Sequence, residues 1–507
     1  MTQSNAQNSI KNVVFAVFLR VLQIVLPFVI RTVIIHSFGL AYVGVSGLFA
    51  SVFGILSIAE LGVGSALLQA LYEPIKKNDI CRIRAILNFY RKSYFAIGLI
   101  ISILGIAILP FIKYLIKEGS YPEELNIYYI YVANLVSTVI GYLVYSYKAL
   151  LLEANQRGRD ANKVRILFTF MTYGFQCIIL FVTHNYYMYI SVVPLVSFLT
   201  AITIARVCDR KYAECYPYGD ISEDDRNKLK TNISALFLYK VGSVVNNNVD
   251  GIVISAILGA TIMGVYNNYY YIVSSLSALI TVCYTAILPS VGNSISGKEN
   301  TDNYILLLES QSLDNWINGW GAICLACLLP NFILLWVGEE GSLGKLFAVL
   351  FGVFFYFWRI MDPISMFKDA LGVWREDRWR PLAAAVVNVI ANILLVNVIG
   401  VYGILLSTIA AVVCISFPFS VKALTRHLGR GTREYLMKAL AWLIFDIAIG
   451  SITWLICQAI SVENILCDFI LDLLLCIIVP NIAFFAVNRK NTLFTGLLSR
   501  FRGRHNE

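Results

Sequence analysis

Apolar stretches of about 20 residues recur along the whole chain and are separated by short polar connections. A helix of that length crosses the roughly 30 Å of hydrocarbon in a bilayer. The stretches are continuous and do not alternate apolar with polar residues, which excludes a transmembrane β-barrel. The pattern predicts an all-α polytopic membrane protein with about 14 transmembrane helices. The expected spans are residues 12–36, 43–70, 92–115, 124–150, 166–184, 187–206, 231–258, 260–289, 315–337, 345–370, 381–400, 402–424, 439–458 and 466–487.

Lys and Arg residues concentrate in alternate connections between the expected spans, which predicts the orientation of the chain. The connections that hold Lys76, Arg157 and Arg226 are expected in the cytoplasm, whereas the opposite ones are a few residues long. Residues 1–11 are polar and no small-residue cleavage site follows, so we do not expect a cleavable signal. An even number of spans then places both termini in the cytoplasm.

The composition agrees with this picture: 58% of the 507 residues are hydrophobic and 14% are charged. The net charge of +9 reflects the basic cytoplasmic loops and attraction to anionic membrane lipids, and it does not require a nucleic-acid partner. We expect the C-terminal tail to form a short helix on the membrane surface. Its apolar face is formed by Leu493, Phe494, Leu497, Leu498 and Phe501, beside Arg500, Arg502 and Arg504.

Residues 12–57 and 232–277 are similar when they are aligned without gaps. Six expected spans separate these two copies, so both cross the membrane in the same direction, as in transporters built from parallel repeats. The identical pairs include Gly39 with Gly259 and Gly44 with Gly264. The repeat predicts an N-terminal six-helix lobe (1–206), a cytoplasmic linker (207–230), a C-terminal six-helix lobe (231–424), two additional transmembrane helices (425–487) and a basic cytoplasmic tail (488–507).

Basic residues inside the expected spans are the strongest functional signal. Arg20 falls opposite Lys240 in the repeat alignment, and a cation in hydrocarbon costs roughly 2.5–3.5 kcal/mol even on the lenient insertion scale. Arg20 shares a helix face with Gln23, and Lys240 shares one with Asn247. Two cations at matching positions predict a cavity, lined from both lobes, that binds an anionic ligand. The expected cavity residues are Arg20, Gln23, Arg31, Lys240, Asn247 and Arg359.

These residues also have structural interpretations. Arg20 and Lys240 could each pair with an acid elsewhere, and Arg31 could anchor a helix end at the membrane surface by snorkelling. Arg359 and Asp362 are three residues apart on one helix and could form a local ion pair. The candidates for coupling to a proton or sodium ion are Glu60, Asp250 and Asp362.

The chain offers no catalytic constellation. No loop is long enough for a catalytic domain, the four histidines are dispersed, and no nucleophile stands near a base in the sequence. Cys324-x-x-Cys327 lies inside an apolar stretch, where small packing residues are the favoured interpretation. We therefore expect a protein that is not an enzyme and has no metal site and no cofactor.

The segments YEPIKKND, ILNFYRKSY and YKALLLEANQR, with residues 18–67, resemble the bacterial polysaccharide repeat-unit (Wzx-like) flippases. Those flippases belong to the multidrug/oligosaccharidyl-lipid/polysaccharide (MOP) exporter superfamily. The resemblance implies a multi-pass protein of the bacterial cytoplasmic membrane. It also implies transfer of undecaprenyl-pyrophosphate-linked oligosaccharide from the inner to the outer leaflet, through a central cationic cavity.

The first expected span has no Asp or Glu, whereas many related drug exporters place an ion-binding acid there. This departure disfavours the main alternative, an ion-coupled drug or cation antiporter of the same fold. A membrane glycosyltransferase or ligase is the weaker alternative.

Overall fold

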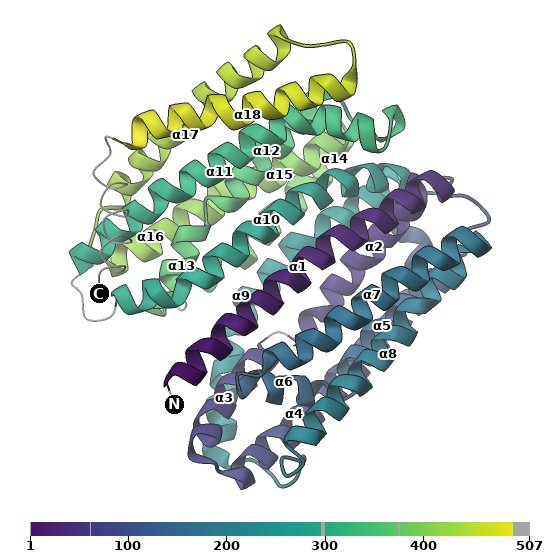
Figure 1. The fold of residues 1–507 in the computed structure, drawn as a ribbon, viewed down its shortest axis with the longest axis vertical. Helices are drawn as coiled ribbons and strands as arrows, with labels where there is room; N and C mark the ends of the chain where they lie inside the picture. The colour runs from purple at the N-terminus through teal and green to yellow at the C-terminus, as the bar shows by residue number, and fades with distance from the viewer. Residues whose placement is uncertain (1, 61, 296–299, 374–375, 490–507) are drawn as a thin grey trace. The chain divides into compact units, whose positions relative to one another are not determined.

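The computed structural model describes residues 2–60, 62–295, 300–373 and 376–489, and these residues form helices and turns with no β-strand. The expected all-α fold is therefore confirmed (Figure 1). The surface helix expected in the C-terminal tail lies outside the described residues.

The chain divides into two compact units, residues Met1–Gly264 and Val265–Glu507. The helices that begin in the first unit are α1 (Thr2–Phe38), α2 (Leu40–Leu56), α3 (Val63–Lys77), α4 (Ile80–Ile108), α5 (Ile127–Leu143), α6 (Ser146–Ala154), α7 (Gly158–Thr183), α8 (Tyr186–Lys211), α9 (Glu223–Val253) and α10 (Ala260–Ile295). The second unit adds α11 (Asn300–Trp336), α12 (Lys345–Arg359), α13 (Asp362–Leu371), α14 (Arg380–Ile399), α15 (Val401–Ala411), α16 (Phe417–His427), α17 (Thr432–Ala459) and α18 (Ile465–Asn488).

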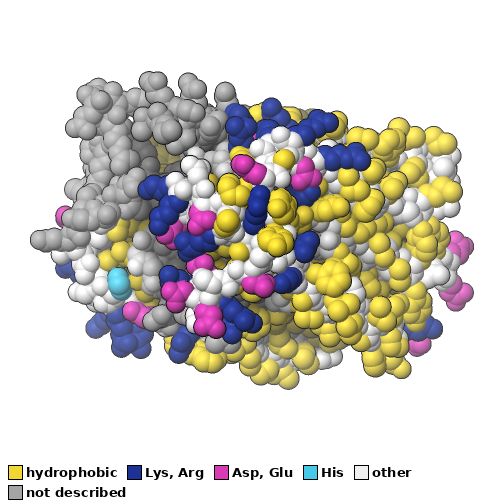
Figure 2. Space-filling view, turned by 90° about the horizontal axis from the view of Figure 1, so that it is seen from below, with side chains coloured by type: hydrophobic (Ala, Val, Ile, Leu, Met, Phe, Trp, Pro, Cys, Tyr) yellow, Lys and Arg dark blue, Asp and Glu magenta, His cyan; other side chains and the backbone are white. Residues whose placement is uncertain are grey.

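Within the described part of the chain, 12 helices are long and apolar enough to cross a membrane, and the bent pair α5 and α6 makes 13 when it is counted as one span. The remaining expected span corresponds to α10, so the count is consistent with about 14. Helices on the outside of both units expose large apolar side chains, among them Leu195, Ile444 and Ile482. Figure 2 shows one face on which charged side chains gather in one region and hydrophobic side chains cover much of the rest.

The first unit is built from long helices that pack along their lengths. α1 packs against α2 and α7, α5 packs against α8, and α2 packs against α9. Asn126 and Asn185 begin α5 and α8 by accepting hydrogen bonds from backbone N–H groups of the first turn. The packing of α9 on α2 and α3 places this helix in the first unit. The lobe boundaries expected from the repeat remain a prediction.

The internal repeat is visible in the backbone of the first unit. Gly39 precedes α2 with φ 93° and ψ 173°, and its repeat equivalent Gly259 precedes α10 with φ 104° and ψ 170°. This positive-φ conformation is readily adopted only by glycine. A Cβ on Gly44 would lie 1.8 Å from the Ala260 carbonyl oxygen, and one on Gly264 would lie 2.1 Å from the Leu40 carbonyl oxygen. Because Leu40 and Ala260 are themselves repeat equivalents, the two copies cross symmetrically, with backbones in contact.

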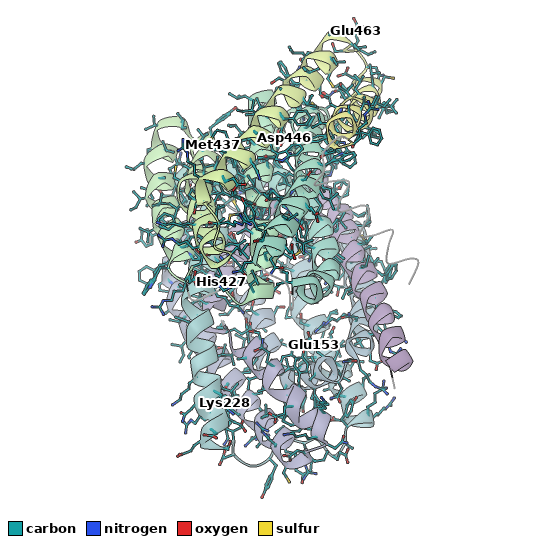
Figure 3. All side chains as sticks on the ribbon, turned by 90° about the vertical axis from the view of Figure 1, so that its left-hand side faces the viewer. Glu153, Lys228, His427, Met437, Asp446 and Glu463 are labelled. Carbon is teal, nitrogen blue, oxygen red and sulfur yellow. The ribbon has the colours of Figure 1, made fainter. Side chains whose placement is uncertain are left out.

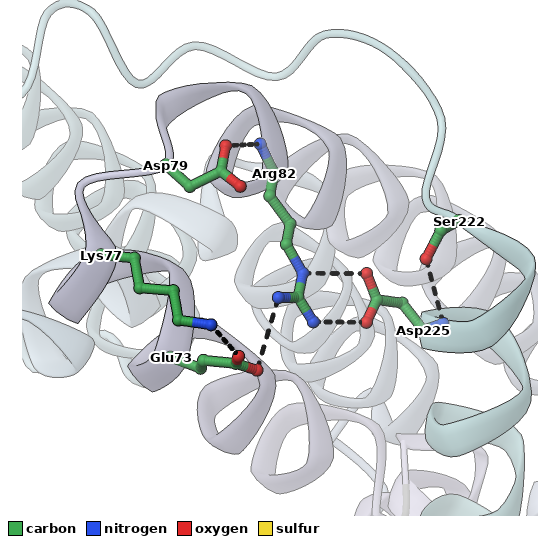
Figure 4. Close-up of polar contacts among 6 residues, drawn as sticks. All are labelled: Glu73, Lys77, Asp79, Arg82, Ser222 and Asp225. Atoms are coloured by element: carbon green, nitrogen blue, oxygen red, sulfur yellow. Dashed lines mark hydrogen bonds and ion pairs between the residues drawn. The ribbon is translucent and has the colours of Figure 1, made fainter.

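An ionic cluster joins the start of α9 to α3 and α4 (Figure 4). Arg82 on α4 donates from Nε and a terminal nitrogen to the two carboxylate oxygens of Asp225, at 3.0 and 2.7 Å. Glu73 on α3 lies 3.4 Å from the same guanidinium and accepts a hydrogen bond from Lys77. Ser222 begins α9 by accepting the Asp225 backbone N–H. The Arg82 hydrogen bonds hold the pKa of the Asp225 carboxyl below its usual value.

The second unit encloses a polar core around α11. Asp314, Asn315 and Asn318 on this helix are buried, as is Asp446 on α17. Figure 3 shows α17 running from Met437 past Asp446 toward the turn at Glu463. Asn315 donates to Asp446 at 3.2 Å, and Asn318 donates to Asp314 at 2.6 Å. Asp314 and Asp446 are thus hydrogen-bonded by neutral groups, whereas the buried Asp377 of the same unit pairs with Lys368 and Arg380.

Candidate functional site

Two helix breaks in the first unit shape the candidate site. α2 ends at Leu56, a short 3-10 turn η1 (Ser57–Glu60) follows, and Gly62 adopts a left-handed conformation with φ 87° before α3 begins. α5 and α6 meet at an angle of 51°. At that bend Tyr145 has φ 53°. Irregular backbone at membrane depth is tolerated where it lines a cavity, and transporters use such breaks at their binding sites.

Both breaks line a cavity of about 750 Å³ that lies wholly within the first unit. Glu60 reaches it from the first break, Tyr142 and Ser146 reach it from the second, and Gln23 reaches it from α1. Its wall is rich in hydroxyl groups, which can exchange hydrogen bonds with a polar ligand. The hydroxyl-bearing residues are Tyr90, Tyr94, Ser137, Thr138, Tyr142, Tyr145, Ser146, Thr169, Thr172, Tyr173, Ser197 and Thr200.

Glu60 is the best-defined carboxylate of the cavity. The Tyr94 hydroxyl donates to one of its oxygens at 2.5 Å, and the Tyr142 hydroxyl donates to the other at 3.0 Å. Tyr90 stacks on Tyr94 with ring centroids 4.1 Å apart. Glu60 forms no ion pair with Arg20 or any other described residue. A carboxylate that is held by two phenols and faces a polar cavity can take up a proton or a small cation.

Arg20 and Gln23 project from the same face of α1, and both side chains are exposed within the first unit. Gln23 lines the cavity, and Arg20 lies one helical turn before it. Lys240 on α9 is half-buried, and Asn247, two turns further on, is exposed. Among the described residues, neither Arg20 nor Lys240 has an ion-pair partner. The structural interpretation that each basic group is neutralised by an acid is therefore not supported within the described part of the first unit.

Close packing against α2 fixes the position of α9, the helix that carries Lys240 and Asn247. A Cβ on Gly54 would lie 2.1 Å from the Asn248 side-chain oxygen, and one on Gly251 would lie 2.3 Å from the Ser51 hydroxyl oxygen. The glycines therefore allow contacts that a larger residue would prevent. Arg31 and Asp250 are both partly buried in the first unit. Their roles in the cavity remain predictions.

Arg359 has different surroundings in the second unit. Its side chain is 4% exposed and forms an ion pair with Asp362. Its guanidinium also donates to the hydroxyls of Ser277 at 3.0 Å and Thr281 at 2.8 Å. The Tyr284 ring lies below it, with the centroid 5.6 Å from the guanidinium carbon. The structure thus brings Arg359 and Asp362 together as the local pair that their spacing allows.

The sequence did not identify the tyrosines that hold Glu60. Tyr90, Tyr94 and Tyr142 look like ordinary aromatic residues in apolar helices, and only the helix breaks bring them to the acid. Asp314 and Asp446 were also missed, although an acid in an apolar stretch is itself a signal of function.

A comparison with protein-family models finds no match, and a search of curated proteins finds none either. Solved structures do match. The lipid II flippase MurJ, in an inward closed conformation, aligns with a TM-score of 0.64 and 16% identity over 95% of this chain and 99% of that chain. The chain therefore shares its fold with this flippase. A mutant form of the MATE transporter VcmN of Vibrio cholerae aligns with a TM-score of 0.60 and 13% identity over 84% of this chain and 98% of that one. An inward-facing multidrug resistance MATE family transporter of the MOP superfamily aligns with a TM-score of 0.58 and 14% identity, covering 81% and 94%.

Proposed function

We propose that this MOP-fold protein is a flippase for undecaprenyl-pyrophosphate-linked oligosaccharide, a repeat unit of a polysaccharide, capsule or O-antigen. The substrate would pass from the inner to the outer leaflet of the bacterial cytoplasmic membrane by alternating access, with both protein termini in the cytoplasm. The observation that carries this proposal is the presence of Arg20 and Lys240 without acidic partners among the described residues, on helices of a transporter fold. Membrane cations without such partners favour an anionic ligand.

The chemistry of the substrate matches the side chains. Pyrophosphate oxygens require charge-assisted donors, which an arginine fork and a lysine ammonium provide. The glycan requires hydrogen-bonding walls, and Gln23, Asn247 and the hydroxyl-rich cavity beside Gln23 can supply them. We assign Arg31 a secondary contact near the outer end of α1. Transfer between leaflets breaks no covalent bond, so the protein acts as a transporter and not as an enzyme.

Arg359 already forms an ion pair with Asp362, so we do not assign it a direct contact with the substrate. We keep it in the proposed set as a source of positive electrostatic potential in the second unit. Among the candidates for proton or sodium coupling, Glu60 has the clearest support, since its carboxylate faces a polar cavity and is held by phenols. Asp250 and Asp362 are the further candidates. Anionic lipids of the inner leaflet would contact the basic cytoplasmic loops.

The proposal is tested with the full chain reconstituted in sealed vesicles that carry a pyrophosphate-linked oligosaccharide lipid. A glycan-cleaving enzyme added outside reports which substrate molecules have reached the outer leaflet. We expect protein-dependent exposure of the inner pool, and loss of this exposure in the Arg20→Ala variant. An inner pool that stays protected with active, correctly inserted protein would refute flippase activity on this substrate.

A second candidate function is ion-coupled export of cationic drugs, which Glu60 and the tyrosines of its cavity favour. Cation–aromatic contacts and one carboxylate suit an organic cation. This alternative predicts drug resistance that depends on Glu60 and is indifferent to Arg20. Measuring resistance of cells that produce Glu60→Gln and Arg20→Ala variants separates the two functions.

A further inference from the structure

Three helices of the second unit bring cysteine side chains together. Cys327 on α11, Cys457 on α17 and Cys476 on α18 have sulfur atoms that all lie within 4.8 Å of one another. Their side chains are buried, with exposures of 7%, 3% and 0%. The three residues are far apart in sequence, so only the packing of α11 with α17 and α18 creates this cluster.

Two further groups border the three thiols. Cys324 lies one turn before Cys327 on α11, and its thiol donates to the Cys476 carbonyl oxygen at 4.0 Å. Asp472, one turn before Cys476 on α18, lies next to the Cys457 thiol and is 5% exposed. One of its carboxylate oxygens, Oδ1, has no hydrogen-bond partner in the described part of the chain. The cluster therefore offers three cysteine ligands for a metal ion and two candidates for a fourth ligand.

We propose that Cys327, Cys457 and Cys476 bind a thiophilic divalent ion of the zinc type. A Zn–S bond is about 2.3 Å long, so sulfur ligands in a tetrahedral site are about 3.8 Å apart. The thiols are therefore close to this spacing, and small side-chain rotations would complete it. Binding one ion releases the three thiol protons and forms three metal–thiolate bonds. The fourth bond is to the Asp472 carboxylate, or to Cys324 after it loses a proton of its own.

The charge of the ion decides between the two common thiophilic metals. Three thiolates and an anionic fourth ligand leave a net charge of −3 with a monovalent copper ion, whereas they leave −2 with a divalent zinc-type ion. The smaller charge is favoured because the surroundings are apolar and each buried charge is costly. Phe484 and Ile323 belong to the apolar cluster that surrounds the cysteines.

Such an ion would attach the two C-terminal helices, α17 and α18, to α11. The sequence alone favours a packing role for Cys324-x-x-Cys327, because nothing in it indicates that Cys457 and Cys476 lie nearby. The site shares no residue with the proposed substrate and coupling set, so its test is independent of the transport proposal.

The experiment uses the full chain purified in detergent, stripped of metal by a chelator and kept reduced. Cd²⁺ is titrated first because cadmium–thiolate absorbance counts the sulfur ligands, and Zn²⁺ is then used as a competitor. We expect one Cd²⁺ per chain with at least three thiolate ligands, and a higher melting temperature with Zn²⁺ than without it. The Cys476→Ser variant should lose at least tenfold in affinity.

Cys467→Ser is the matched control, since Cys467 is an exposed cysteine on the same helix and should leave binding unchanged. Cys327→Ala serves as a second test if Cys476→Ser does not fold, as judged by circular dichroism. Absence of thiolate absorbance in folded, reduced protein would overturn the proposal. A disulfide among these cysteines in protein isolated without reductant, with no metal bound after reduction, would overturn it as well.

Discussion

The basic groups within the membrane-spanning helices fall into two kinds. Arg20 and Lys240, in the first unit, have no ion-pair partner among the described residues, and Arg20 is exposed. Arg359, in the second unit, is buried, paired with Asp362 and hydrogen-bonded to two hydroxyls. Sequence position alone would give all three the same role. We therefore expect a membrane cation to bind a ligand where the protein itself leaves its charge uncompensated.

The largest stability effect is expected for Arg359→Ala. This change leaves the Asp362 carboxylate without its partner, and breaking a buried pair costs about 3–5 kcal/mol. We expect a large drop in melting temperature and poor accumulation in membranes, whereas Arg20→Ala should melt like the native protein. Thermal unfolding in detergent compares the two variants. A native-like melting temperature for Arg359→Ala would contradict the claim that Arg359, unlike Arg20, stabilises the fold.

A smaller effect is expected at the ionic cluster outside the membrane-spanning part of α9. Asp225→Asn removes a charged acceptor from Arg82 and should cost about 1.5–3 kcal/mol of unfolding free energy. The pKa of Asp225 is lowered in the folded protein, so its contribution is present above the unfolded pKa of about 3.9 and is lost as the pH falls through the folded value. Unfolding of native and variant protein between neutral and acidic pH checks this, and a difference that persists unchanged at the acidic end would contradict it.

Glu60→Gln tests whether the carboxylate in the first unit couples transport to an ion. The amide keeps the size of the side chain and cannot be ionised, so protein stability should change little. Ion-driven transport should fall by about tenfold, within the usual range of coupling energies. Tyr94→Phe is the companion variant, because it removes one phenol while keeping the charge. Undiminished ion dependence in Glu60→Gln would assign coupling to other residues.

The smallest effect is expected at the exposed end of the ionic cluster. Glu73 and Lys77 are both more than half exposed, so water and salt screen their pair. The pKa of Glu73 is lowered by the Lys77 hydrogen bond, but we expect Lys77→Ala to leave the melting temperature unchanged within error. A clear loss of stability would show that the cluster acts as a connected network in which Lys77 supports Arg82.

The sequence predicted the helical membrane fold well because apolar length is a direct consequence of bilayer thickness. It also revealed the repeat. In the structure the two copies cross symmetrically at Gly44 and Gly264. It could not predict the cavity, since Gly62 and Tyr145 break two helices through backbone conformations that hydropathy does not record. For the same reason it missed the phenols around Glu60 and the meeting of Cys457 with Cys476. These features depend on contacts between distant segments.

The most direct test of the central claim is export in cells that lack their own flippase and depend on this protein. Arg20→Ala and Lys240→Ala should each abolish surface polysaccharide while the variant protein remains in the membrane at native levels, and Arg20→Lys should retain part of the export. Full export by both alanine variants would contradict a substrate-binding role for these cations.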